Sequence, residues 1–188
     1  MFNPVRVSMA TFLMAAAIAG AAEGDAAAGR RKTVTCNACH GQSGFKSMPR
    51  LGGQSAAYLV AALHAYKEDK RVHATMRDVA HALSERDMAD LAAHYASAPQ
   101  VVGESVVTAP DVVGRCATCH GVDGARPAAP GIALIAGQNA GYLDLALREY
   151  KSGIRLHALM QDQVRDLGDE QITEAVSWYA AQKGLSVK

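Results

Sequence analysis

The sequence predicts an all-α protein built from two tandem, homologous units. A six-residue motif and a series of later residues recur at a nearly constant spacing, which indicates internal duplication. Apolar residues follow a helical period in each unit, and no stretch alternates as a strand would. The chain has 188 residues, with 19 Lys and Arg against 18 Asp and Glu, so it lacks the bulk charge that attracts nucleic acid or anionic lipid.

Residues 1–22 predict a secretory signal peptide. Arg6 precedes a mostly apolar run, Val7–Ala19, and small residues then allow cleavage after Ala21 or Ala22. A bilayer-spanning helix needs about 20 apolar residues, which is more than this run provides. We therefore expect an exported, soluble mature chain, with an uncleaved N-terminal anchor as the alternative.

The repeat defines the domain organisation. The segment Cys36–Gly41 recurs as Cys116–Gly121, and further along Gly53 matches Gly137, so that the offset between the units grows by four. The extra residues fall in a Pro/Ala/Gly-rich stretch before Gly137, where a loop insertion costs little. Two prolines and a Val/Thr/Ser run interrupt the helical pattern between the units. The predicted parts are the signal peptide, domain 1 at 23–98, a linker at 99–110 and domain 2 at 111–188.

Three helices are expected in each unit. The first starts near Ala26 or Asp111 and ends with the repeated motif. Capping patterns precede the third, from Ser84 to Asp87 and from Gly168 to Gln171. The second and third helices are expected at about 55–68 and 85–96 in the first unit, and at 139–152 and 169–180 in the second.

All four cysteines lie in two Cys-x-x-Cys-His motifs, which are the attachment signature of c-type haem. On a helix, the two thiols lie on one face and can hold the haem vinyl groups as thioethers, while the following histidine can bind the iron. The predicted attachment and proximal residues are Cys36, Cys39 and His40 in the first unit and Cys116, Cys119 and His120 in the second.

Zinc and redox sites use similar cysteine pairs. A zinc site is disfavoured because the separation between Cys39 and Cys116 is far longer than in paired zinc knuckles. A Cys-x-x-Cys disulfide or a thioredoxin-like pair would not explain a histidine after both pairs, and no βαβ pattern is present. The sequence therefore favours two covalently bound haem c groups, each with one iron.

Matched methionines are the leading candidates for the second axial ligand. Met160 is the only methionine after the second motif, and Met76 is its equivalent in the first unit. Both fall in segments predicted to connect the second and third helices. Met48 follows His40 so closely in the sequence that it could not easily return to the opposite face of the haem. Met88 is expected to pack in a core.

Histidines offer an alternative to this assignment. His73 and His157 match one another three residues before each methionine, so bis-histidine ligation is the other possibility. The histidines without a partner in the second unit, His64, His81 and His94, are expected on the surface or in packing.

A loop carbonyl is expected to orient each proximal histidine by accepting its Nδ1–H. Pro49 is the candidate for His40, and Pro127 and Pro130 compete for this role beside His120. Histidine and methionine together fill both axial positions and raise the reduction potential. A closed iron of this kind favours outer-sphere electron transfer, and no phosphate loop, nucleophile elbow or paired carboxylates suggest an enzyme.

These motifs resemble the cytochrome c4 family and related dihaem c553-type proteins. The resemblance rests on the two Cys-x-x-Cys-His-Gly motifs, the two Gly-Gln-x-x-x-Tyr-Leu segments and the two matched methionines, and it covers nearly the whole mature chain. It implies two class I cytochrome c domains related by a pseudo-twofold axis, with haems facing across the domain interface. It also implies a periplasmic role in delivering electrons to terminal oxidases.

The leading functional hypothesis is a periplasmic electron carrier of the respiratory chain. Its donor would be a quinol-oxidising complex or a dehydrogenase, and its acceptor a terminal oxidase. A dedicated cytochrome subunit or electron acceptor of one dehydrogenase, such as a sulfur-compound-oxidising enzyme, is the alternative. A dihaem peroxidase would need an exchangeable ligand, which the matched methionines disfavour. We expect no integral membrane span after signal cleavage, and at most peripheral association.

Overall fold

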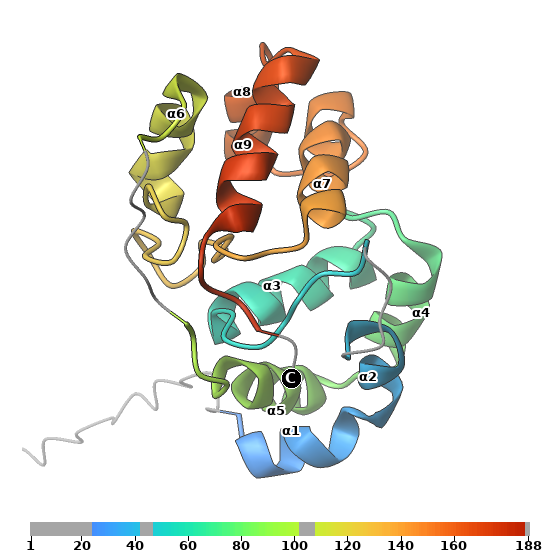
Figure 1. The fold of residues 1–188 in the computed structure, drawn as a ribbon. Coiled ribbons are helices and arrows are strands. Elements are labelled where there is room, and N and C mark those ends of the chain that lie inside the picture. The colour runs from blue at the N-terminus through green and yellow to red at the C-terminus, as the bar shows by residue number, and fades with distance from the viewer. Residues whose placement is uncertain (1–23, 42–46, 102–107, 187–188) are drawn as a thin grey trace, which may run out of the picture.

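The computed structural model describes residues 24–41, 47–101 and 108–186, which form two groups of helices (Figure 1). Within this described part no strand forms, and a single isolated antiparallel bridge joins Gly52 to Ser186. The all-α prediction is thus confirmed. The predicted signal peptide, 1–22, and residues 102–107 of the predicted linker lie outside the described residues, and the domain boundaries stay predictions.

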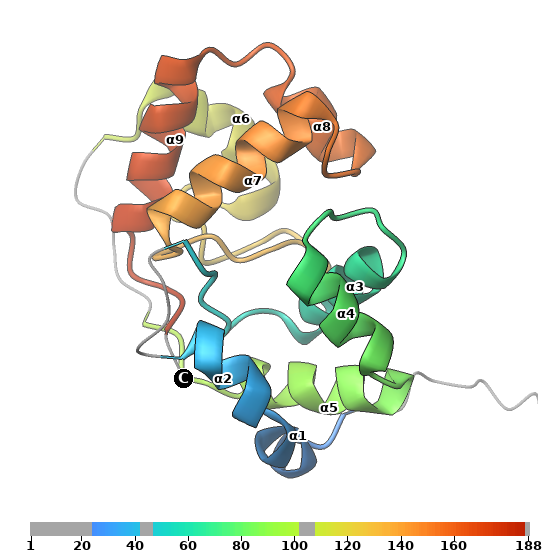
Figure 2. The same cartoon turned by 90° about the vertical axis from the view of Figure 1, so that its right-hand side faces the viewer.

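Each group contains one helix that ends in a Cys-x-x-Cys-His motif. The first group consists of α1 (Ala26–Lys32), α2 (Val34–His40), α3 (Ala56–Lys67), α4 (Ala74–Ala82) and α5 (Glu85–Ala96). The second consists of α6 (Asp111–His120), α7 (Ala140–Ser152), α8 (Ala158–Val164) and α9 (Asp169–Ala181). Figure 2 shows the second group stacked on the first, with α7 and α8 on the side of α3 and α4.

Side-chain caps start the predicted helices where the sequence placed them. Ser55 accepts a hydrogen bond from the backbone N–H of Tyr58 and begins α3. Ser84 and Asp87 form the complete capping box of α5. In α9, Gln171 accepts from the backbone N–H of Gly168 at 3.0 Å, which is the half of the box that a glycine allows.

Two expectations about helices were wrong. The methionine-bearing segments are the helices α4 and α8, whereas the sequence suggested connecting segments. Each is capped by a histidine, since Nδ1 of His73 and of His157 accepts from the methionine N–H three residues on, at 3.3 Å. Histidine is not among the usual cap residues, so the start signal is weak in the sequence. The first helix is also split at Thr33, whose hydroxyl donates to the carbonyl of Arg30.

The core of each group forms around its last helix. In α5, Leu91, Ala92 and Tyr95 are buried, and Leu59 of α3 packs in the same cluster as Ala92 and Tyr95. The larger second core gathers residues of α6, α7 and α9. Met88 is fully buried, as the sequence predicted. These cores hold α3 and α7 beside the segments that carry the haem motifs.

Gly29 lets α1 lie directly against α5. A Cβ at this position would come within 1.9 Å of the Asp90 carbonyl oxygen. We expect Gly29→Ala to lower the free energy of unfolding by about 1–3 kcal/mol, because α1 must move away from α5. Gly114→Ala on the exposed face of α6, where no atom lies within 4 Å, should instead raise it by about 0.5–1 kcal/mol. Urea unfolding of both variants tests this, and a Gly29→Ala protein as stable as the wild type would contradict it.

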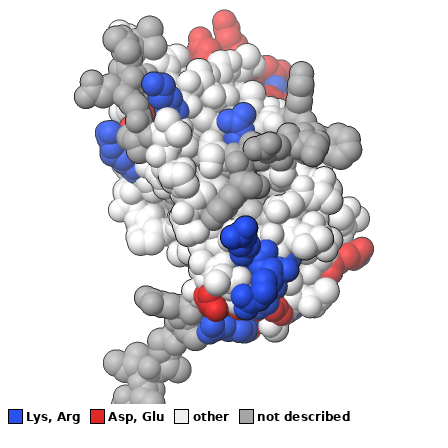
Figure 3. All heavy atoms as spheres, turned by 60° about the horizontal axis from the view of Figure 1, so that its bottom comes forward, with Lys and Arg blue, Asp and Glu red and all other residues white. Residues whose placement is uncertain are grey.

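Charged side chains link α1 to α5 at the end of the molecule shown in Figure 3, where basic residues gather beside carboxylates. Lys32 lies 2.6 Å from Asp87 and 2.7 Å from Asp90. Asp90 is also 3.0 Å from Arg86 and accepts from the backbone N–H of Asp25 at 2.8 Å. This network fixes the start of α1 on α5.

The network predicts a loss of stability in acid. The ammonium of Lys32 and the capping contacts with Ser84 lower the pKa of Asp87 from 3.8 to about 2, and Lys32 lowers that of Asp90 too. The stability from these carboxylates is therefore present above pH 3.8 and is lost as the pH falls toward 2. Urea midpoints measured across this range should fall less steeply for Asp87→Asn than for the wild type. Parallel profiles would show that Asp87 makes no such contribution.

Two glutamines join the helix groups through reciprocal hydrogen bonds. The amide of Gln54 donates to the Leu134 carbonyl and accepts from its N–H, both at 2.8 Å. Gln138, the equivalent of Gln54, bonds the backbone of Arg50 in the same way, at 2.8 and 3.0 Å. Both glutamines are buried. Because the two side chains are fully paired with backbone, they fix the register of one group on the other.

The C-terminal segment also returns to the first group. Backbone hydrogen bonds join Gly52 and Ser186 in both directions, at 2.9 and 3.1 Å, and Val101 donates to the Gly184 carbonyl at 3.2 Å. The end of the chain therefore contacts both groups.

Candidate haem sites

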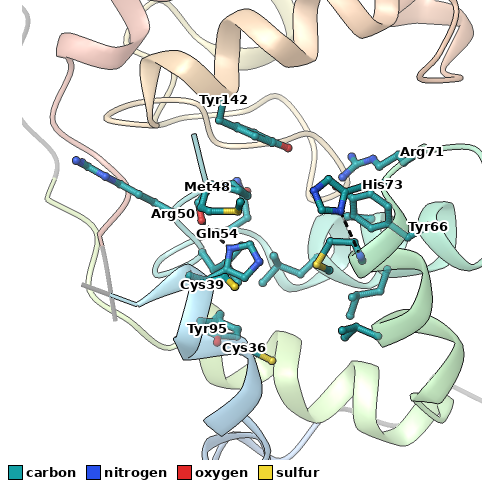
Figure 4. A pocket seen from close by; sticks show the side chains of 18 of the residues that line it. Cys36, Cys39, Met48, Arg50, Gln54, Tyr66, Arg71, His73, Tyr95 and Tyr142 are labelled. Atoms are coloured by element: carbon teal, nitrogen blue, oxygen red, sulfur yellow. Dashed lines mark hydrogen bonds between the residues drawn. The ribbon is translucent and has the colours of Figure 1, made fainter. Parts of the chain in front are cut away.

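A cavity of about 400 Å³ lies beside the first Cys-x-x-Cys-His motif, between the first helix group and residues 133–149 of the second (Figure 4). Cys36, Cys39 and His40 from α2 line it, as does Met76 from α4. Leucines and valines of α3, α4 and α5 complete an apolar wall. The structure thus brings together all four residues predicted for the first site.

His40 is held with one ring nitrogen available. Its Nδ1 lies 3.0 Å from the Pro49 carbonyl oxygen, as predicted from the sequence. This contact leaves Nε2 to face a metal. Burial lowers the pKa of His40, and the hydrogen bond to Pro49 offsets this only in part. The ring is therefore neutral at physiological pH, which is the form that binds iron.

The second site has the same arrangement around a different carbonyl. Nδ1 of His120 lies 2.8 Å from the Ala133 carbonyl oxygen, so the expectation of Pro127 or Pro130 was wrong. Ala133 stands before Gly137 as Pro49 stands before Gly53, which makes the two residues equivalent in the repeat. A backbone carbonyl accepts the histidine N–H whatever side chain its residue carries, so a proline is not required at this position. Burial lowers the pKa of His120 as well.

The second motif lies against the larger core. Cys116 and Met160 are both partly buried there, beside α6, α7 and α9, whereas Cys119 is exposed. Burial raises the pKa of the Cys116 thiol, as it does for Cys36 in the first group. The Cys116 thiol and the Met160 thioether therefore lie against one core in the second group. In the same way, Cys36 and Met76 line one cavity in the first.

Met48 and His73 also line the first cavity. Met48 immediately precedes Pro49, whose carbonyl accepts from His40, so this methionine is held on the side of the proximal histidine. Figure 4 shows Met48 near Gln54 and Cys39, and His73 at the far end beside Arg71. The ring of His73 is exposed and caps α4 through Nδ1. The cap contact gives His73 a structural role at the start of α4, and the identity of the second axial ligand stays a prediction.

The remaining histidines lie where the sequence suggested. His64 is 3.0 Å from Glu85 near the surface, and His94 is buried with its ring edge-on to Tyr95.

Sequence reasoning missed Arg71 and Arg155, which the structure buries where the two groups meet. The sequence signal that could have identified them is that Arg71 and Arg155 occupy equivalent positions of the repeat, with the same offset that relates Gly53 to Gly137.

The side chains present fit a covalently attached haem. Two thiols three residues apart, an oriented neutral imidazole and a thioether surround one apolar cavity, and the repeat supplies a second set. An apolar wall suits the macrocycle, and sulfur and imidazole are ligands of haem iron. Among the described residues, none of the helices combines the length and the apolar character that a membrane span requires.

Comparison with known proteins gives consistent results. Cytochrome c4 of Pseudomonas aeruginosa is 32% identical, over 94% of this chain and 97% of its own length. The thiosulfate dehydrogenase electron acceptor of Thiomonas intermedia is 28% identical, over 96% and 93%. The structure of reduced cytochrome c4 from Pseudomonas stutzeri superposes with a TM-score of 0.72 at 25% identity, covering 85% of this chain and 99% of that one. No family model matches.

Proposed function

Because the chain belongs to the cytochrome c4 family of dihaem electron carriers, we propose that it transfers single electrons in the periplasm between respiratory donors and a terminal oxidase. The two covalently bound haems supply one-electron chemistry at iron. The residues of this chain attach and orient them, and exclude water from them.

Four residues in each unit perform the attachment and ligation that we propose. The thiols of Cys36 and Cys39, and of Cys116 and Cys119, anchor the haems. The iron ligands are His40 with Met76, and His120 with Met160. Support comes from the hydrogen bonds that orient both histidines, and from the position of Met76 on the wall of the His40 cavity.

The location of Met76 in the His40 cavity is the observation that carries this function. An iron held by both His40 and Met76 would have no ligand position left for a substrate or peroxide. It would supply outer-sphere electron transfer, which suits a carrier and does not suit an enzyme. The apolar wall favours the reduced, less charged state of the iron.

An exported carrier needs partners on the outer side of the inner membrane. The predicted signal peptide supports a periplasmic location, and a quinol-oxidising complex or a dehydrogenase would be the donor. A dedicated electron acceptor of one dehydrogenase is the second candidate. It is favoured by the Thiomonas intermedia relative, whose name describes a thiosulfate dehydrogenase electron acceptor.

Stopped-flow mixing of the holoprotein distinguishes the two candidates. The reduced protein is mixed with oxidase-containing membranes of the host cell, and the oxidised protein with thiosulfate and a thiosulfate dehydrogenase. We expect the membranes to oxidise the reduced protein rapidly, and we expect cyanide to block this oxidation. Reduction by the dehydrogenase with no reaction at the membranes would overturn the respiratory assignment in favour of the dedicated acceptor.

A further inference from the structure

Two basic side chains lie on the surface at the end of α1. Arg30 and Arg31 are exposed, whereas Gly29 is buried against α5. Figure 3 shows basic side chains gathered at this end of the molecule. Among the described residues, no carboxylate lies within 4 Å of either arginine, although the neighbouring Lys32 is paired with Asp90. The solvent-facing side of α1 therefore carries a surplus of positive charge.

An exposed apolar side chain continues this surface toward the first haem site. Val34 begins α2, which follows directly on α1 (Figure 2), and its exposed fraction is 79%. Ala38 lies one helical turn further, about 6 Å along the axis, and is exposed as well. Thr35 and Ala38 also line the cavity of the first site, so they form part of its rim. We call Arg30, Arg31, Val34 and Ala38 the α1–α2 face.

The second unit does not repeat this face. At the offset that relates the two Cys-x-x-Cys-His motifs, Asp111 stands in place of Arg31, and Gly114 stands in place of Val34. The charge is thus reversed at one position, and the apolar side chain is absent at the other. Both units carry the same haem motif, so the α1–α2 face serves a purpose other than haem attachment.

Helix stability accounts for only part of the α1–α2 face. Basic side chains in the last turn of a helix suit the negative end of its dipole, so Arg30 and Arg31 stabilise α1 to some extent. That effect does not require an exposed valine, which is neither a strong helix former nor part of a core. Arginine beside an exposed apolar side chain is the composition that protein–protein interfaces favour.

The charge of this face selects a partner with an acidic surface. Carboxylates on an approaching protein are attracted by Arg30 and Arg31, and complementary charge of this kind steers encounter and sets orientation. A lipid surface is disfavoured, because α1 has only seven residues and carries no large apolar side chain that could enter a bilayer. The rim position of Ala38 would place such a protein at the edge of the first site.

We propose that the α1–α2 face is the docking site of an acidic redox protein, which exchanges electrons with this chain through the first haem site. The inference rests on the proposed function and on the attachment of a haem to Cys36 and Cys39. One electron passes in each encounter. The partner gives up or accepts that same electron, so no further reactant is needed.

Poly-L-glutamate is the acidic probe that tests binding. Added to isotope-labelled, reduced holoprotein at low ionic strength, it should shift the amide resonances of Val34 and Ala38. The double variant Arg30→Glu, Arg31→Glu should lose these shifts, and the double variant Arg30→Lys, Arg31→Lys should keep them. Arg115→Glu is the matched control, because this exposed arginine lies on α6 of the second unit, and its charge reversal should leave the shifts unchanged.

Electron-transfer rates test whether this face serves the reaction. Stopped-flow mixing with membranes of the host cell measures oxidation by the oxidase and reduction by the quinol-oxidising complex. For the double variant Arg30→Glu, Arg31→Glu, at least one of these reactions should be about tenfold slower than for the wild type at low ionic strength. The difference should shrink in high salt, which screens exposed charges. Val34→Asn should slow the same reaction at low and high salt alike, while haem spectra and midpoint potentials stay unchanged.

The outcomes separate this inference from the proposed function. Equal rates for the wild type and the double Glu variant in both reactions would overturn the docking site, as would resonance shifts centred on the second motif. Sedimentation with phosphatidylglycerol vesicles that depends on Arg30 and Arg31 would assign the face to a lipid surface instead. If poly-L-glutamate produces the expected shifts but the membranes neither oxidise nor reduce the wild type, the respiratory assignment fails and the acid-binding face stands.

Discussion

Replacing Met76 by alanine is expected to lower the reduction potential of one haem by on the order of a tenth of a volt, within the roughly 0.8 V that axial ligands span. Methionine favours reduced iron, and its loss also leaves one face of the metal open. The reduced variant should therefore bind carbon monoxide at one haem, whereas the wild type should bind none. Redox titration and absorption spectra after carbon monoxide addition measure both effects.

Other methionines supply the controls. Met160→Ala should produce the same changes at the second haem, and the double variant should change both. Met48→Leu should leave both potentials close to the wild-type values, although Met48 lines the same cavity. Unchanged potentials in Met76→Ala, or a carbon monoxide complex in Met48→Leu, would show that Met76 is not the ligand.

Replacing Cys36 and Cys39 together by alanine should prevent the first domain from folding. Without thioether bonds the haem is not retained, and the apolar side chains of α3, α4 and α5 that line its cavity lose the surface they pack against. Each leucine or valine that loses its burial against the haem forfeits about 1.5–3 kcal/mol, so the loss of several such contacts costs on the order of 5–10 kcal/mol. That is comparable with the whole stability of a domain, about 5–15 kcal/mol.

Haem content and far-ultraviolet circular dichroism of the purified variant test this prediction. We expect one haem for each chain in place of two, together with loss of helical signal from about half of the protein. Cys116→Ala with Cys119→Ala is the matched variant and should lose the other haem. A Cys36/Cys39 variant that keeps two haems, or the full helical signal, would contradict the prediction.

Most of the fold could be predicted because the chain repeats itself. Helices with an ordinary cap, such as the one that starts after Ser84, carry their start signal in the sequence. The helices α4 and α8 do not, because the imidazole of His73 or His157 replaces the usual cap. Their apolar faces are also short, so periodicity alone did not reveal them.

The candidate sites show the same division between local and long-range information. The contact of His40 with Pro49 involves neighbouring residues, and loop chemistry was enough to predict it. The hydrogen bond from His120 to Ala133 spans the inserted residues, so the sequence alone did not show which residue of the second unit is equivalent to Pro49. The pairing of Arg155 with Tyr58 joins residues from opposite halves of the chain, and no local pattern reports such a contact.

The reciprocal bonds of Gln54 and Gln138 have a further consequence. In a symmetric homodimer every interface contact occurs twice, with the roles of the two subunits exchanged. The bonds of these glutamines to Leu134 and Arg50 obey that rule within a single polypeptide. A true dimer must keep both copies identical, whereas here each copy is encoded separately. One half can therefore mutate without the other, as Arg50 and Leu134 already illustrate, and the two haems are free to acquire different partners.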